Sequence, residues 1–364
     1  MNGWQQVTLD DVAIINPTES LKKGQLAKKI AMESIQPFTK NPSGFSLTEF
    51  NGGMKFRNGD TLVARITPCL ENGKTSYIDV LDEGEIGFGS TEYIVLREKP
   101  QISDKQFLYY FSISPIFRDV AILSMTGSSG RQRVQTDVVR QHLFELPSIE
   151  EQKAIAAVLS SLDDKIDLLH RQNKTLETMA ETLFRQWFVE EAEDWKDGIL
   201  GDVIELIYGK ALKEDLRTGS GYPVVGSSGT VGHHAEYLVE GPGIVIGRKG
   251  TLGKVTYLFE NFFPIDTTYY IKSKINSAGM LYECFLLKTL SFENSDSAVP
   301  GLNRDIALSE EIKIPPQNLI EEFNDICAGF FSKMKVNINQ IRTLENLRDI
   351  LLPKLMSSEV RVEV

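Results

Sequence analysis

Basic side chains set among glycines are the residues of this sequence best suited to chemistry. Segment 247–254 places three of them among three glycines, namely Arg248, Lys249 and Lys254. Small residues let the main chain approach a phosphate closely, and Arg or Lys can then contact a phosphate or the edge of a base. Asn303 and Arg304, further along the chain, offer side chains suited to the same contacts. We therefore predict that these five residues contact nucleic acid.

The first half of the chain contains a comparable loop at residues 127–133, which reads Gly-Ser-Ser-Gly-Arg-Gln-Arg. Its candidate DNA contacts are Ser128, Ser129, Arg131, Gln132 and Arg133. Lys74 lies in a Gly-Lys-Thr turn and is predicted to face a phosphate, while Ser227 and Ser228 lie in a loop that could reach a groove. Arg65 ends an apolar run, so burial against a carboxylate and contact with DNA both stay open. A solvated turn is the alternative for residues 127–133.

Motifs for other kinds of chemistry are incomplete. Segment 247–254 resembles a phosphate-binding loop, but Arg248 replaces its first glycine and Val255 replaces the Ser or Thr that would hold magnesium. His233 and His234 are adjacent and have no third metal ligand nearby, which favours a solvated loop. No Gly-x-Ser-x-Gly motif occurs. We therefore expect no catalytic residues, no metal and no cofactor, and hence a chain that is not an enzyme.

The composition is that of a folded protein of two to three domains. The 364 residues are 41% apolar and 24% charged, and no run approaches the roughly 18 apolar residues that a membrane span needs. Three cysteines lie far apart without a Cys-x-x-Cys pair, which is typical of reduced thiols, and the first residues lack the pattern of a secretory signal. These features predict a cytoplasmic protein with no membrane contact.

The net charge of −11 does not exclude DNA binding, because it is unevenly distributed. More than half of the acidic excess lies in residues 148–194, whereas residues 1–147 are nearly balanced. A basic face on the first segment is therefore allowed.

The sequence contains an internal repeat. Short segments of the first half recur in the same order in the second half: 4–12 with 195–203, 59–65 with 243–248, 73–77 with 253–257, 90–95 with 266–271, 130–133 with 301–304, and 146–147 with 314–315. Each match is weak alone, but their shared order indicates a duplicated unit. Each copy begins with 120 to 150 residues rich in glycine, β-branched and aromatic residues, and ends in a long helical pattern.

The two helical patterns follow a heptad frame. In the first, apolar residues recur at seven-residue intervals from Ile155 to Leu183, and a second position carries Leu159, Ile166, Asn173, Ala180 and Trp187. The second copy keeps the frame with Phe323, Phe330, Asn337, Leu344 and Leu351, and with Cys327, Met334, Ile341, Arg348 and Leu355. This period is typical of a coiled coil. Ser148 and Glu151 have capping-box spacing, and Pro353 is expected to kink or end the second helix. Two amphipathic helices that each pack on their own domain are the alternative.

An antiparallel pairing of the two seams about their midpoints makes a specific prediction. It places Leu159 opposite Leu351 and Asn173 opposite Asn337, the single asparagine of each seam. A buried asparagine is costly unless it is paired, so such a pair fixes the register. We therefore predict side-chain contact between Asn173 and Asn337.

Several segments resemble the specificity subunits of type I restriction–modification enzymes. They are residues 55–68, 87–97, 146–156, 221–232 and 264–270. The most specific is Leu-Pro-x-x-Glu-Glu-Gln at the start of the first helix, from which the second copy departs at 314–321. The resemblance covers nearly all of the chain.

The resemblance implies an α+β fold with two pseudo-repeated α/β target-recognition domains separated by two long antiparallel coiled-coil helices. The expected divisions are a first recognition domain at 1–147, a first spacer helix at 148–193, a second recognition domain at 194–314, a second spacer helix at 315–358 and a tail at 359–364. A pseudo-repeated chain of this kind also suits a duplex that is read at two separated sites.

The resemblance further implies a non-catalytic subunit that reads a bipartite, asymmetric sequence in double-stranded DNA. Two methyltransferase subunits, which bind S-adenosylmethionine themselves, would dock on this scaffold, and a restriction subunit would join them. The alternatives are a stand-alone or orphan DNA-binding protein and a scaffold without restriction partners.

Overall fold

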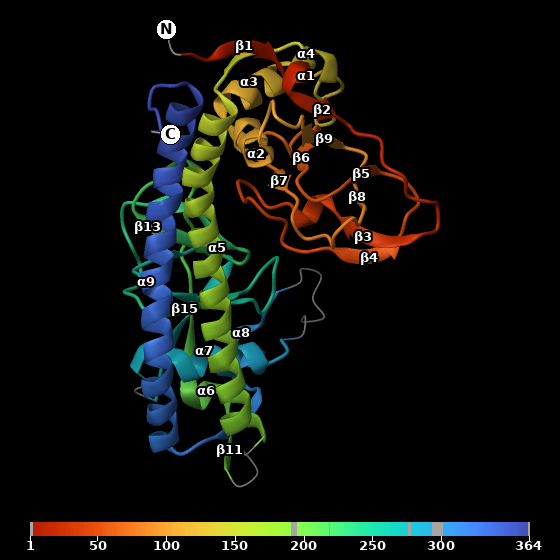
Figure 1. Ribbon diagram of the computed structural model, residues 1–364. Coiled ribbons are helices and arrows are strands. Elements are labelled where there is room, and N and C mark those ends of the chain that lie inside the picture. The colour runs from red at the N-terminus through yellow and green to blue at the C-terminus, as the bar shows by residue number, and fades with distance from the viewer. Residues whose placement is uncertain (1–2, 191–194, 218, 276–277, 293–300, 363–364) are drawn as a thin grey trace. The chain divides into compact units, whose positions relative to one another are not determined.

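The computed structural model describes residues 3–190, 195–217, 219–275, 278–292 and 301–362 (Figure 1). The chain divides into two compact units, and the first combines residues 1–168 with 340–364. The second unit comprises residues 169–339. The expected boundary between 193 and 194 lies outside the described residues, as do the last two residues of the expected tail.

The first unit contains two four-stranded sheets and one strand pair. One sheet has the order β2-β9-β6-β7, and the other has the order β4-β3-β8-β5. The bounds are β2 Ala13–Ile15, β3 Leu26–Ile30, β4 Ser46–Glu49, β5 Met54–Phe56, β6 Thr61–Ala64, β7 Thr75–Tyr77, β8 Gly87–Gly89 and β9 Tyr93–Glu98. β1 (Gln5–Thr8) pairs antiparallel with β10 (Leu143–Leu146). Every residue of β6 is buried, as expected of a continuous apolar run inside a sheet.

Short helices cover the first unit: α1 Leu9–Val12, α2 Lys105–Ile113, α3 Pro115–Leu123 and α4 Thr136–Arg140. α2 begins where Asp104 Oδ1 accepts the amides of Gln106 and Phe107 at 2.9 and 3.0 Å, which is an N-cap. Its apolar residues join the largest core of this unit, together with Val63 of β6.

The second unit repeats this organisation. Its four-stranded sheet has the order β12-β18-β15-β16, and a three-stranded sheet has the order β14-β13-β17. The strands are β11 Lys196–Ile199, β12 Ile204–Tyr208, β13 Tyr222–Gly226, β14 Gly229–His234, β15 Gly243–Gly247, β16 Val255–Leu258, β17 Phe263–Pro264, β18 Thr268–Ser273 and β19 Glu311–Ile314. The helices are α6 Leu200–Val203, α7 Leu281–Thr289 and α8 Arg304–Leu308. β11 pairs antiparallel with β19, as β1 does with β10.

The sheet orders confirm the duplicated α+β fold. Backbone hydrogen bonds correct two details of the alignment between the two copies. The amide of Arg65 donates to Glu92 O, and that of Arg248 donates to Thr267 O, both at 2.9 Å. Glu92 therefore corresponds to Thr267, one residue away from the alignment of 90–95 with 266–271.

A second shift affects the loop after the sheet. The carbonyl of Arg65 accepts the amide of Val134, and that of Arg248 accepts the amide of Leu302, both at 2.9 Å. Asn303 is consequently equivalent to Gln135, and each residue directly precedes a short helix. The match of 130–133 with 301–304 is wrong by three residues, because short glycine-containing strings align by composition rather than by backbone geometry.

The two long helices are α5 (Ile149–Arg185) and α9 (Gln317–Met356). α5 continues into a π-helical segment, Gln186–Glu190, and the amide of Glu151 donates to Ser148 Oγ at 3.3 Å near its start. α9 runs through Pro353 and ends at Met356, within one turn. In the first unit, Leu159 belongs to the same apolar cluster as Leu351. No helix of the described residues is long and apolar enough to cross a bilayer.

The asparagine pair forms as predicted. Asn337 Nδ2 donates to Asn173 Oδ1 at 2.9 Å, and Asn337 is completely buried. Gln172 Oε1 lies 3.4 Å from the same nitrogen. Further along the second unit, the rings of Trp187 and Phe323 lie 6.4 Å apart, which keeps the antiparallel register.

Replacing Asn173 by Leu is expected to lower the free energy of unfolding by about 1–3 kcal/mol, because the buried amide of Asn337 loses its main partner. Urea unfolding followed by circular dichroism measures this change. The double variant Asn173→Leu/Asn337→Leu should recover most of the loss, since neither amide is then stranded. A single variant as stable as the wild type would reject the register role of the pair.

Candidate nucleic-acid interface

The first unit brings two predicted arginines together around one carboxylate. Arg133 donates to Glu92 through Nε at 3.0 Å and through Nη2 at 2.7 Å. Arg65 Nε lies 3.6 Å from Glu92 Oε2. The hydrogen bonds from Arg133 hold the pKa of Glu92 below its usual value, although partial burial opposes them. One carboxylate therefore offsets one of the two positive charges, and Arg133 makes the closer contact with it.

Most of the other residues of the predicted loop are exposed. Ser128, Ser129 and Arg131 lie at the surface, and the amide of Arg131 donates to Ser128 O at 2.9 Å to close the turn. The Arg131 guanidinium makes no hydrogen bond or ion pair with another described residue. Gln132 is half-buried and accepts the amide of Thr67 with its carbonyl at 3.0 Å. Arg131 is thus the freest cation of this loop.

Lys74 is directed into its own unit. Its Nζ donates to the carbonyl of Met32 at 2.8 Å, and the side chain is half-buried. A phosphate contact at Lys74 would require this hydrogen bond to break.

The second unit arranges two arginines around a tyrosine, and Arg304 also lies 3.4 Å from Asp305 Oδ1 through its Nε. The guanidinium of Arg248 lies 5.1 Å from the ring centre of Tyr208, and that of Arg304 lies 5.6 Å from the same ring. We call Tyr208, Arg248 and Arg304 the Tyr208 cluster. Tyr208 is 47% exposed, so this stacked group faces solvent. Stacking on an aromatic ring orients a guanidinium without cancelling its charge.

The Tyr208 ring rests on a buried neighbour. Its centre lies 4.9 Å from that of Tyr269, which is 1% exposed. Burial raises the pKa of Tyr269 to about 12, and Tyr208 adds to this shift whereas Arg248 opposes it. Sequence reasoning overlooked Tyr208, because the last residue of a strand carries no motif that marks a ring-stacking position.

The remaining predicted residues of the second unit surround the loop after β15. Lys249 is exposed, and its amide donates to Thr267 O at 3.1 Å. Lys254, the residue before β16, donates from Nζ to Ser228 O and so contacts the loop that contains Ser227 and Ser228. A Cβ at Gly247 would lie 2.0 Å from the carbonyl oxygen of Thr251, so only glycine fits the turn.

Asn303 caps a short helix, and its contact with DNA stays a prediction. Its Oδ1 accepts the amides of Asp305 and Ile306 at 2.9 and 3.1 Å, which caps α8. The cap places Arg304 in the first turn, where the ring of Tyr208 lies within stacking distance. Asn303 therefore positions a candidate contact, and a direct base contact would compete with the cap.

The two units differ at the position that lies beside the first arginine of each site. Glu92 of the first unit is replaced by Thr267 in the second, so no carboxylate stands at the equivalent place beside Arg248. No cluster of His, Cys, Asp and Glu among the described residues could hold a metal ion. The chemistry that these sites offer is recognition of an anionic, hydrogen-bonding surface.

Comparison with known families agrees with this chemistry. The model of the type I restriction modification DNA specificity domain matches residues 1–178 and 192–340. The chain belongs to this family.

Two specificity subunits and one solved structure illustrate the relationship. The chain is 32% identical to the type I restriction enzyme EcoAI specificity subunit of Escherichia coli over 208 residues, 53% of this chain and 35% of that protein. It is 27% identical to the MjaIX specificity subunit of Methanocaldococcus jannaschii over 307 residues, 71% of this chain and 69% of that protein. The chain thus spans about a third of the first relative and two thirds of the second.

The crystal structure of the type I restriction-modification system S subunit from M. genitalium has the same fold. Its TM-score is 0.56 at 19% identity, and the match covers 97% of this chain and 96% of that one.

Replacing Arg248 and Lys249 together by Ala is expected to weaken binding to every duplex, because one cation of the Tyr208 cluster and its chain neighbour are lost. The slope of log K against log salt should fall by up to about two. Titration of labelled duplexes at several salt concentrations, with the chain assembled with its methyltransferase partners, measures both quantities. Lys272→Ala/Lys313→Ala is the matched control, since both lysines are exposed and lie outside the cluster.

If Arg248 reads a guanine, Arg248→Ala alone should relax one position of the target at a cost of about 1–3 kcal/mol. Unchanged affinity, salt slope and target in the double variant would assign both side chains to solvent.

Proposed function

We propose that this chain is the sequence-specific DNA-recognition subunit of a type I restriction–modification complex and reads a bipartite, asymmetric target with two recognition domains. The observation that carries the proposal is the repeated sheet, which places Arg65 and Arg248 at equivalent backbone positions. Their surroundings differ, with Glu92 beside one and Tyr208 beside the other. One scaffold with two unlike surfaces suits a target with two unlike halves.

The proposal assigns the recognition domains to residues 1–147 and 194–314, and the helices to 148–193 and 315–358. Phosphate contacts fix the position of a protein on DNA, and base-edge contacts give the specificity. Exposed Arg131 and Lys249 suit the first task, and the oriented Arg248 and Arg304 suit the second. Methyl transfer and its cofactor belong to the partner subunits in this proposal, and the complex is proposed to act in the cytoplasm.

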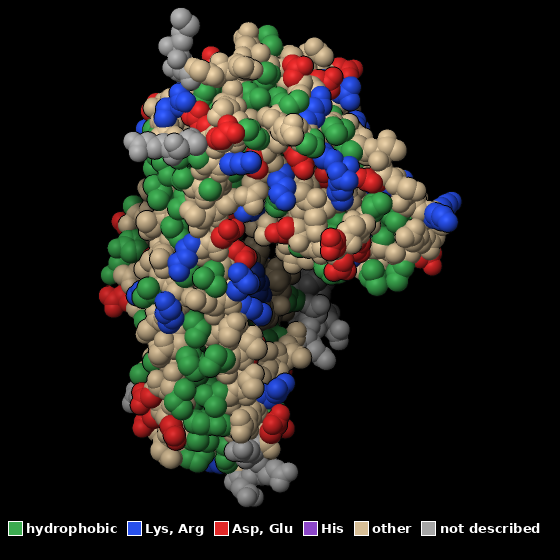
Figure 2. Space-filling model, in the orientation of Figure 1, with side chains coloured by type: hydrophobic (Ala, Val, Ile, Leu, Met, Phe, Trp, Pro, Cys, Tyr) green, Lys and Arg blue, Asp and Glu red, His purple; other side chains and the backbone are tan. Residues whose placement is uncertain are grey.

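Two apolar patches on the helices support docking of two methyltransferase subunits. In the second unit, α5 and α9 form a groove of about 570 Å³ whose lining includes Met179, Leu183, Ile326 and Phe330. Figure 2 shows hydrophobic side chains gathered over this part of the helix pair. Met179 is 47% and Ile326 40% exposed. Single exposed apolar residues are common on protein surfaces, but a contiguous group of them often marks a binding site. We call this group the Met179 patch.

The heptad repeat generates an equivalent group in the first unit. The residues at the same heptad positions are Leu347, Leu351, Val158 and Leu162, in the order of the Met179 patch. Leu347 is 42% and Val158 36% exposed. We call this group the Leu347 patch. Two equivalent apolar patches suit two copies of one partner, and the restriction subunit would join the assembled core.

Met179→Asp and Leu347→Asp are each expected to remove one methyltransferase subunit, because a charge in an apolar interface costs several kcal/mol. Native mass spectrometry of the co-expressed complex should show two methyltransferase copies for the wild type, and one for each variant. Leu123→Asp is the control, since Leu123 is 85% exposed and lies on α3, outside both patches. Two copies in both patch variants would show that the partner binds elsewhere.

The recognition proposal is tested by exchanging residues 1–147 for the first recognition domain of another family member. Only one half of the methylated motif should change, because the second domain and the helices are untouched. Methylation-sensitive sequencing of cells that express the chimaera measures this result. A change in both halves would contradict the proposal, and so would a change in neither.

A further inference from the structure

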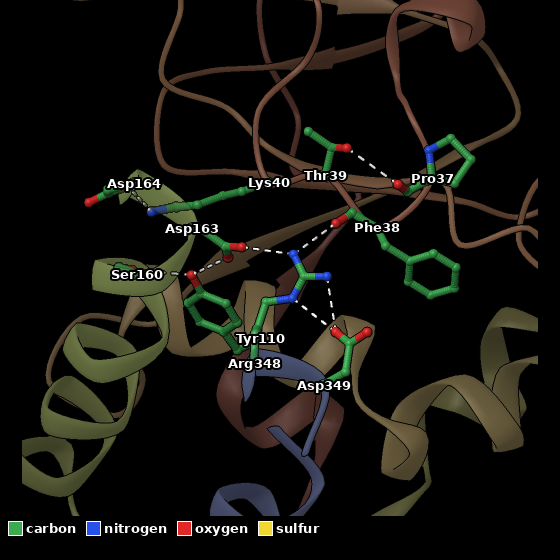
Figure 3. Close-up of polar contacts among 10 residues, drawn as sticks. All are labelled: Pro37, Phe38, Thr39, Lys40, Tyr110, Ser160, Asp163, Asp164, Arg348 and Asp349. Atoms are coloured by element: carbon green, nitrogen blue, oxygen red, sulfur yellow. Dashed lines mark hydrogen bonds and ion pairs between the residues drawn. The ribbon is translucent and has the colours of Figure 1, made fainter. Parts of the chain in front are cut away.

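A buried polar cluster joins the first recognition domain to both long helices (Figure 3). Arg348 of α9 donates through Nη1 to Asp163 Oδ1 of α5 at 2.9 Å and to the carbonyl of Phe38 at 3.1 Å. Tyr110 of α2 donates to Asp163 Oδ2 at 2.7 Å. The side chains of Arg348 and Asp163 are only 7% and 4% exposed. Three elements of the first unit and the loop that contains Phe38 therefore meet at one ion pair.

Arg348 stays charged in this setting. Burial lowers the pKa of its guanidinium, but Asp163 and then Asp349 outweigh burial and raise it. Arg348 Nε also donates to Asp349 Oδ1 at 3.0 Å.

The ion pair breaks the apolar pattern of the seam. The heptad positions equivalent to Asp163 and Arg348 in the second unit are occupied by Phe331 and Ala180, both buried. The chain can therefore build this layer from apolar residues. A buried ion pair is weak evidence for stability, because desolvation of two charges offsets their attraction. The use of a charged layer where an apolar one is possible points to a role in fixing how the first recognition domain is held on the helices.

The loop at residues 37–40 is held in a conformation that presents its carbonyl to Arg348. Phe38 adopts a left-handed backbone with φ of 54°, which a bulky residue rarely does unless its surroundings require it. The guanidinium of Arg118 lies 5.1 Å from the centre of its ring. The Phe38 amide donates to the carbonyl of Gly73 at 3.1 Å. The contacts at the ring and backbone offset the strain.

Lys40 provides a second attachment of the same loop. Its Nζ donates to Asp164 Oδ1 of α5 at 3.1 Å, and its side chain is 7% exposed. The Lys40 carbonyl accepts the amide of Tyr77 in β7 at 2.8 Å. The loop is thus fixed to the recognition sheet on one side and to the helices on the other.

We propose that Arg348 and Asp163, together with Lys40 and Asp164, form a latch that sets the orientation of the first recognition domain on the helix pair. Arg348 is a positioning residue, which contacts no DNA itself. The latch limits how far the first domain can tilt, so it restricts the distance between half-sites that the complex accepts. This inference rests on the proposed bipartite recognition.

The test replaces the charged layer with the chain's own apolar layer, in the variant Asp163→Phe/Arg348→Ala. The variant should remain folded. The Phe38 and Tyr77 amides should exchange with deuterium about tenfold faster, the factor for a loss of about 1.4 kcal/mol in local opening free energy. Lys354→Ala is the matched control, because it removes a solvent-exposed cation of α9 within two turns of Arg348.

The second readout is selectivity for half-site spacing. The assembled complex is titrated with duplexes whose half-sites are at the native distance, or one base pair closer or further apart. We expect the preference of the variant for the native distance to fall by about tenfold, while Lys354→Ala keeps the wild-type preference. A loss of stability alone would weaken binding at all three distances equally and would overturn the latch.

Further outcomes separate this inference from the proposed function. If the double variant does not fold, Lys40→Met is measured instead, because it releases the loop without touching the seam. Unchanged exchange and unchanged spacing preference in the folded variant overturn the latch. A wild-type complex that binds no duplex overturns the proposed function, and hydrogen exchange then decides whether the ion pair holds the loop.

Discussion

The hydrogen bond between Asn337 and Asn173 constrains which residues of α5 can face α9 in the second unit. The bond is 2.9 Å long, Asn337 is completely buried and Asn173 is half-buried, so a slip of the helices would leave the Asn337 amide without its partner in apolar surroundings. The positions of the apolar residues follow from that register. In each unit, a set of apolar residues remains exposed or half-buried along the helices, and these sets form the Met179 and Leu347 patches.

Much of the architecture can be predicted from the sequence, because a duplicated chain with two heptad seams leaves few alternatives. The asparagine contact follows from one heptad frame applied twice. The alignment of the recognition sheets is less predictable, since backbone hydrogen bonds define equivalence there and short glycine-rich strings do not. This explains the one-residue shift at Glu92 and the three-residue shift at Asn303.

Side-chain pairing is the part of the site that spacing does not reveal. Arg133 donates to Glu92, and Lys74 donates to a carbonyl of its own unit. Asn303 accepts amides at the start of α8. Each of these partners comes from a position that no motif marks. In the sequence, Arg348 is a charged residue at an apolar heptad position. The structure explains it, because Asp163 and the carbonyl of Phe38 accept its hydrogen bonds.

The central claim is that one duplicated chain reads two separated, unlike half-sites. Methylome sequencing of cells with and without this chain tests it most directly. We expect a single motif made of two different short halves, separated by a spacer of fixed length and arbitrary sequence, whose methylation disappears when the chain is deleted. A methylome that does not change on deletion would contradict the claim, as would the loss of a continuous motif without a spacer.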